Sequence, residues 1–105
     1  MLTRIPASQE QIDAIYRKHI KLPVFFANYS YDNEDNIGFV SCYSLLGAFI
    51  EFQVIRNQTT PMFFSIRPGG NNISYDVSYP KGKLLERLTE ISNKARDHFW
   101  KGGQI

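Results

Sequence analysis

The two histidines are the side chains best suited to proton transfer. His19 and His98 each lie near lysines, and each follows a segment with helical spacing. Two imidazoles can cleave RNA without a metal, because one removes the 2′-hydroxyl proton and the other protonates the leaving group. Both rings must then reach the same phosphate, which the spacing does not establish. A histidine in the last turn of a helix is also stabilised by the helix dipole, and we prefer this structural interpretation.

Three carboxylates lie close together in the polar segment 32–36. Asp32, Glu34 and Asp35 do not fit the twelve-residue calcium loop, which requires a central glycine and a terminal glutamate. The segment therefore predicts a solvated turn and no metal site. The same carboxylates form an acidic patch that could meet a basic partner.

Two other features resemble reactive sites only weakly. The single cysteine, Cys42, lies in the middle of a predicted strand, whereas reactive thiols usually lie at a helix N-terminus or beside a base. The segment 67–72 lacks the spacing of a phosphate-binding loop and precedes a strand, so a hairpin turn explains it. We predict a buried thiol, no cofactor and no catalytic set, so the chain is not expected to be an enzyme.

The composition indicates a folded domain and leaves its partner undecided. The chain has 105 residues, of which 43% are hydrophobic and 14% aromatic, and we predict a single domain over residues 1–105. The net charge of +2 argues neither for nor against a nucleic acid. Low cysteine content and the lack of a signal peptide or membrane-length apolar run favour a cytoplasmic protein.

Two segments have the pattern of amphipathic helices. Ser8 and Gln11 have the spacing of a capping box, and apolar residues then recur at helical spacing, which predicts a helix over residues 9–20. A longer apolar stripe predicts a second helix over about 81–101, before Gly102 and Gly103.

Alternating residues between the helices predict strands over 24–31, 37–56, 62–67 and 73–79. Gly47 interrupts the longest of these, where it marks either a bend in one strand or a break between two; we prefer the bend. The predicted fold is therefore α+β, with a four-stranded, or alternatively five-stranded, antiparallel meander in the order α-β-β-β-β-α and both helices on one face.

The opposite sheet face is expected to be polar with a few large apolar residues, among them Val24, Phe26 and Phe63. Most aromatic residues are expected on the inner face, which argues against a nucleic-acid partner. Trp100 follows Phe99 at the end of the second predicted helix and is an apolar residue beyond those that its stripe requires, so it could contact a partner. The predicted partner-binding residues are Asp32, Glu34, Asp35, Glu51, Gln53, Phe63, Asp76 and Trp100.

The leading functional hypothesis is a small protein-binding module. Compact α+β domains without a catalytic set are common among bacterial or phage antitoxins, immunity proteins and inhibitors, so we expect it to neutralise a partner such as a basic toxin or nuclease. The alternatives are a metal-independent ribonuclease-type toxin that uses His19 and His98, and a nucleic-acid-binding accessory protein. No membrane association is expected.

Overall fold

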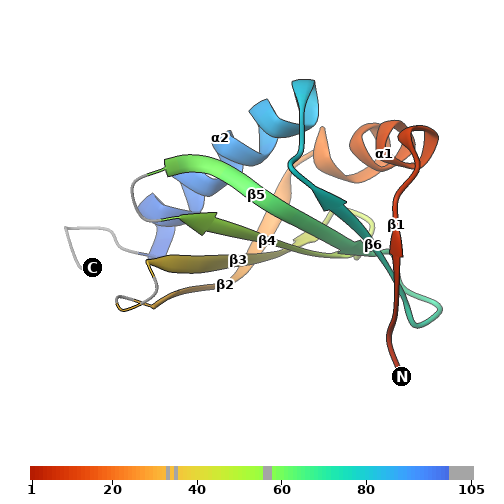
Figure 1. Cartoon of the computed structure of the whole chain (residues 1–105), viewed down its shortest axis with the longest axis horizontal. Helices are drawn as coiled ribbons and strands as arrows, with labels where there is room; N and C mark the ends of the chain where they lie inside the picture. The colour runs from red at the N-terminus through yellow and green to blue at the C-terminus, as the bar shows by residue number, and fades with distance from the viewer. Residues whose placement is uncertain (33, 35, 56–57, 100–105) are drawn as a thin grey trace.

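The computed structural model describes residues 1–32, 34, 36–55 and 58–99, and within 58–60 it describes the backbone without the side chains. These residues form a six-stranded mixed sheet in the order β1-β6-β5-β4-β3-β2. Both helices lie against the same face of the sheet (Figure 1). The elements are β1 (Thr3–Pro6), α1 (Gln9–Ile15), η1 (Tyr16–Ile20), β2 (Val24–Asp32), β3 (Ile37–Ser44), β4 (Phe49–Ile55), β5 (Gln58–Arg67), β6 (Ile73–Ser78) and α2 (Gly82–Phe99).

The strand β1 makes the predicted order α-β-β-β-β-α wrong. It precedes the first helix and pairs in parallel with β6, so that Thr3 lies beside Ile73 and Pro6 beside Asp76. The other pairings are antiparallel and follow chain order from β2 to β6. The sheet is therefore a five-stranded meander with one added parallel edge strand. A four-residue strand that ends in proline is typical of an edge, where a missing N–H is tolerated.

The segment 37–56 is not one bent strand. Ser44 N donates to the carbonyl of Ala48 at 2.9 Å, and Gly47 N donates to the carbonyl of Ser44 at 2.9 Å. These bonds close a short hairpin loop between β3 and β4, and Gly47 has a φ of +86°, which glycine adopts without steric cost. The strand predicted over 62–67 also begins earlier than expected, because β5 starts at Gln58.

A β-bulge in β2 changes which side chains face the helices. Phe26 pairs with Cys42 and Asn28 pairs with Ser41, so the register shifts at Ala27. Val24 and Phe26, which we expected on the open side, belong to the helix-covered side and pack against the core. Phe25 lies on the open side instead, 56% exposed. A bulge places an extra residue in one strand and so reverses the alternation on its two sides.

The helices agree with the sequence prediction over the described residues. Ser8 Oγ accepts a hydrogen bond from Gln11 N at 3.2 Å, and Gln11 Oε1 accepts one from Ser8 N at 2.8 Å, which confirms the capping box. The first helix continues as the π-helical segment η1, where Lys21 N donates to the carbonyl of Tyr16 at 2.8 Å. The second helix occupies Gly82–Phe99.

The hydrophobic core lies between the helices and the covered face of the sheet. Its largest fully buried side chains include Phe52, Phe64 and Leu88, each 0% exposed. Alternate residues of β4 and β5 also belong to this core: Ile50, Phe52, Val54, Phe64 and Ile66. Burying large apolar side chains is the main favourable term in folding, so this layer fixes the position of the opposite face.

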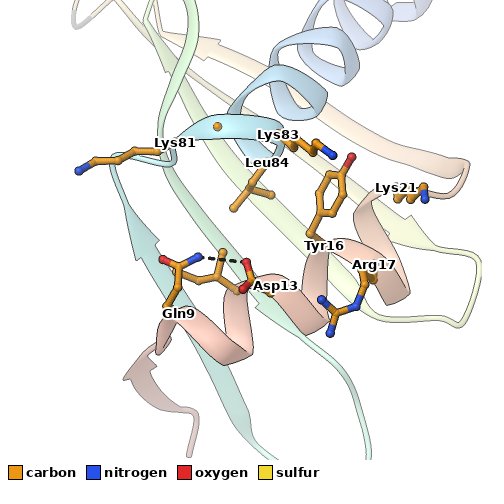
Figure 2. Close-up of a pocket in the computed structure, with 10 residues that line it drawn as sticks. Gln9, Asp13, Tyr16, Arg17, Lys21, Lys81, Lys83 and Leu84 are labelled. Carbon is orange, nitrogen blue, oxygen red and sulfur yellow. Dashed lines mark hydrogen bonds between the residues drawn. The ribbon is translucent and has the colours of Figure 1, made fainter.

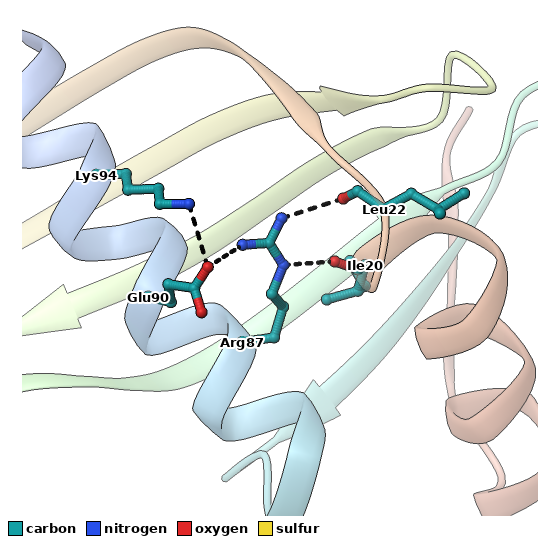
Figure 3. Close-up of polar contacts among 5 residues, drawn as sticks. All are labelled: Ile20, Leu22, Arg87, Glu90 and Lys94. Atoms are coloured by element: carbon teal, nitrogen blue, oxygen red, sulfur yellow. Dashed lines mark hydrogen bonds and ion pairs between the residues drawn. The ribbon is translucent and has the colours of Figure 1, made fainter.

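Arg87 joins α2 to the end of η1 (Figure 3). Its Nε donates to the carbonyl of Ile20 at 2.9 Å, and an Nη donates to the carbonyl of Leu22 at 3.1 Å. The other Nη is 2.7 Å from Glu90 Oε1, which also accepts a hydrogen bond from Lys94 at 3.2 Å. The bond from Lys94 and the charge of Arg87 lower the pKa of the Glu90 carboxyl. Arg87 thus satisfies carbonyls at a helix end that no further turn can reach.

Candidate functional site

The side of the sheet away from the helices is the candidate site, and we call it the open face. Residues directly opposite one another in an antiparallel pair point to the same side, so the register assigns each side chain to a face. The cross-strand rows of the open face contain Phe25, Asn28, Ser30, Phe39, Ser41, Tyr43, Phe49, Glu51, Gln53, Phe63, Ser65, Arg67, Asp76 and Ser78.

One row of the open face is aromatic, and we call Phe25, Tyr43, Phe49 and Arg67 the aromatic row. These residues are successive partners on β2, β3, β4 and β5. The Tyr43 and Phe49 rings meet edge to face at 5.5 Å, and the Arg67 guanidinium lies 5.3 Å from the centre of the Phe49 ring. Phe25 is 56% exposed and Tyr43 is 45% exposed. The row therefore presents ordered aromatic surface to solvent.

The loop between β3 and β4 adds two leucines beside the aromatic row. Leu45 is 55% exposed and Leu46 is 60% exposed. They follow Tyr43 in the chain and precede Phe49, so they lie at the same end of the sheet. Single exposed apolar residues are common, but several on adjoining strands mark an interaction surface.

The next row is polar. Ser41, Glu51, Ser65 and Asp76 are successive partners across β3, β4, β5 and β6. Arg4 of β1 makes an ion pair with Asp76 at 2.9 Å. Its guanidinium also lies 5.6 Å from the centre of the Phe63 ring. Arg4 thus covers the β5–β6 end of the open face and leaves the β2–β4 end accessible.

A third row combines aromatic and polar side chains. Phe39, Gln53, Phe63 and Ser78 are successive partners on β3 to β6, with Ser30 of β2 opposite Phe39. Phe39 is 42% exposed. The open face therefore alternates aromatic, polar and mixed rows along its strands.

The structure brings together four of the predicted partner-binding residues: Glu51, Gln53, Phe63 and Asp76 share the open face. Two more, Asp32 and Glu34, lie at the β2–β3 turn, where Glu34 N donates to Asp32 Oδ1 at 2.8 Å. Asp32 pairs with Ile37, two residues from Phe39, so this turn adjoins the mixed row. Asp35 and Trp100 lie outside the described residues.

The sequence prediction missed the exposed aromatics. Phe25, Phe39 and Tyr43 were assigned to no binding set, and neither was the half-buried Phe49, because aromatics were expected on the inner face. The pattern of β3 carries a partial signal, since Phe39, Ser41 and Tyr43 alternate with three residues that are all buried in the structure: Val40, Cys42 and Ser44. The aromatic side chains were expected inside because they are large. On β3, however, the smaller side chains of Val40, Cys42 and Ser44 face the core.

The two histidines occupy different environments. His19 is 5% exposed, and its Nδ1 shares a 2.9 Å hydrogen bond with Ser44 Oγ, which also accepts a bond from Ala48 N at 3.0 Å. Burial, with a contribution from the charge of Lys18, lowers the pKa of His19. His98 is exposed, and its ring lies 5.4 Å from that of Phe26. A buried imidazole tied to a hairpin loop favours the structural interpretation over the nuclease hypothesis.

Cys42 is buried in the core with 0% exposure. Burial raises the pKa of its thiol to about 12, an effect only partly offset by the positive charge of Arg87. The thiol therefore stays protonated at neutral pH, which is the state of an unreactive core cysteine.

Over the described ranges, no group of three or more histidine, cysteine, aspartate or glutamate side chains is arranged to hold a metal ion. The described helices also include none that is long and apolar enough to cross a membrane. Comparisons with protein-family models, with curated proteins and with solved structures found no match to this chain.

Proposed function

We propose that this chain is a small protein-binding module of the inhibitor or immunity type, which neutralises a partner protein through its open face. The observation that carries the proposal is the exposed aromatic surface at the β2–β4 end, formed by Phe25, Phe39 and Tyr43 at 42–56% exposure. Aromatic side chains held in place by neighbouring strands lose little conformational freedom on binding, and they dominate the affinity of many interfaces.

Carboxylates around the aromatic surface support a basic partner. Glu51 lies in the middle of the open face, one row from Tyr43, and Asp32 and Glu34 lie at the adjoining turn. An interface of aromatic anchors with an acidic rim would attract a positively charged protein and orient it on approach. A basic toxin or nuclease has the matching charge.

A single-stranded nucleic acid is the second candidate, because Arg67 and the rings of the aromatic row resemble a stacking platform. This arrangement weakens the earlier expectation against nucleic acids, which assumed inward-facing aromatics. The carboxylate of Glu51 in the adjacent row would repel phosphates, so we prefer the protein partner.

Capture from the native lysate tests the proposal. Tagged protein should retain one stoichiometric partner at about 0.15 M ionic strength. The double variant Phe25→Ser/Tyr43→Ser should then bind the purified partner about 30-fold or more weakly, as expected for hot-spot aromatics. Tyr79→Ser is the matched control, because Tyr79 is 65% exposed but lies outside the rows of the open face.

The outcomes separate the candidates. If the partner is an enzyme, its activity should fall when one equivalent of this protein is added. Undiminished binding by the double variant would contradict the open-face site. Binding to a single-stranded oligonucleotide that weakens steeply with salt and is lost in Tyr43→Ser would instead support the nucleic-acid candidate.

A further inference from the structure

A second surface lies on the helix side of the sheet, away from the open face. A solvent-open cavity of about 530 Å³ lies between α1, η1 and the start of α2 (Figure 2). Its volume is within the range of about 300–1,000 Å³ that is typical of small-molecule sites. None of its lining residues belongs to the open face, so the proposed function does not account for this cavity.

The lining of the cavity is strongly cationic. Arg17 belongs to η1 and Lys21 directly follows it, whereas Lys81 directly precedes α2 and Lys83 lies in its first turn. Among the described residues that line the cavity, Asp13 is the only carboxylate, and it accepts a 3.0 Å hydrogen bond from Gln9. The lining thus carries more positive charge than the entire chain, whose net charge is +2.

One of these cations, Lys83, lies at a helix end that carries the same sign of charge. The first turn of α2 contains Lys83 and no acidic residue. A helix N-terminus carries partial positive charge, so nearby lysines raise the free energy of the unliganded protein while a bound anion lowers it. In the described part of the chain, Arg4, Arg87 and Lys94 form salt bridges, whereas the four cations of the cavity are exposed and form none.

Apolar groups complete the lining. Figure 2 shows the Tyr16 ring extending from η1 toward the first turn of α2, where Leu84 also faces the cavity. A site with several separated cations and an aromatic wall suits a ligand that has both a multiply charged part and a planar or apolar part.

We propose that this cavity binds an organic phosphate of nucleoside diphosphate size. The phosphates would lie between Lys83 and the cations of the first helical segment, and the remainder would pack against Tyr16. Two linked phosphates match several separated cations better than one carboxylate does. The inference does not depend on the open face, and its failure would leave the proposed function unaffected.

Calorimetric titration of the full chain with adenosine diphosphate, and separately with inorganic pyrophosphate, tests the inference. We expect saturable binding of both, tighter for the nucleotide because only it contacts Tyr16. Arg17→Ala and Lys83→Ala should each weaken binding about tenfold, as expected for the loss of one charge-assisted hydrogen bond. Lys83→Arg should retain most of the affinity.

Lys18→Ala is the matched control, because Lys18 is an exposed cation of η1 that does not line the cavity. Its affinity should stay within about twofold of the parent, since screened exposed charges contribute little at a distance. An equal loss in Lys18→Ala would show nonspecific attraction and overturn the site. The absence of saturable binding, or binding of an oligonucleotide but of neither diphosphate, would also overturn it.

Discussion

The two faces of the sheet both carry aromatic side chains but use them differently. On the covered face, Phe52 and Phe64 are 0% exposed and pack beneath the helices. On the open face, Phe25 and Phe39 are 56% and 42% exposed. The covered aromatics stabilise the fold, whereas the open ones contribute less to it while remaining accessible. A residue type that appears on both faces therefore has two roles, and the strand register decides between them.

The largest expected effect comes from truncating one aromatic on each face. Phe52→Ala should lower the free energy of unfolding by about 3–5 kcal/mol, because it leaves a cavity in the core. Phe25→Ala, its counterpart on the open face, should cost less than about 1 kcal/mol. Urea-induced unfolding followed by circular dichroism measures both. Equal losses would show that the open face is also a packing surface.

Arg87 tests whether the covered side depends on polar contacts as well as on apolar packing. Arg87→Met should cost roughly 2–3 kcal/mol, because it leaves the carbonyls of Ile20 and Leu22 without this donor. The side chain of Arg87 is 16% exposed, whereas that of Lys94 is 63% exposed. Lys94→Ala is thus the matched control and should change the free energy of unfolding only slightly. A similar loss in both variants would contradict a specific role for Arg87.

Gly38 tests the tight packing of the covered face near its edge. A Cβ at this position would lie 2.9 Å from the carbonyl oxygen of Ser30 and 3.2 Å from Val54 Cγ2. Gly38→Ala should therefore cost about 1–3 kcal/mol through overpacking. Ser41→Ala, on the open side of the same strand, should have a smaller effect. Thermal unfolding of the two variants provides the comparison, and a neutral Gly38→Ala would show that β2 can move aside.

His19 gives the smallest effect, which is a dependence on pH. Because the folded-state pKa of His19 is lowered, the unfolded chain binds more protons on acidification. Its contribution to stability is therefore complete above the unfolded pKa of about 6.5 and is lost as the pH falls through and below that value. His19→Gln should reduce the decline in unfolding free energy between pH 7 and 5, about the range over which histidine titrates. His98→Gln should retain it; the same slope in all three proteins would exclude His19 as its source.

Local patterns in the sequence were enough to predict the helices and most of the covered face. The capping box at Ser8 and the alternation from Ile50 to Val54 depend on neighbours within a few residues. Such signals are visible without knowledge of the tertiary structure. Four residues of the predicted binding set do share the open face: Glu51, Gln53, Phe63 and Asp76.

The missed features depend on contacts between distant parts of the chain. The acceptors of Arg87 lie 65 and 67 residues away, so no local sequence pattern reveals these hydrogen bonds. The strand β1 has no alternation of its own, and it is defined by its pairing with β6. The bulge at Ala27 has no strong local signal, yet it places Phe26 and Asn28, two residues apart, on opposite faces. The aromatic row could not be predicted without that register.

The position of β1 also bears on the order in which the fold can form. Its partner β6 lies 70 residues later, with Thr3 opposite Ile73. During synthesis, β1 can therefore pair only after all the other strands have been made. Each hairpin from β2 to β6, in contrast, can form as soon as its second strand has been synthesised. Bringing together such distant segments is entropically costly and slow. Until β1 pairs with it, β6 is an unprotected edge to which another chain could add a strand.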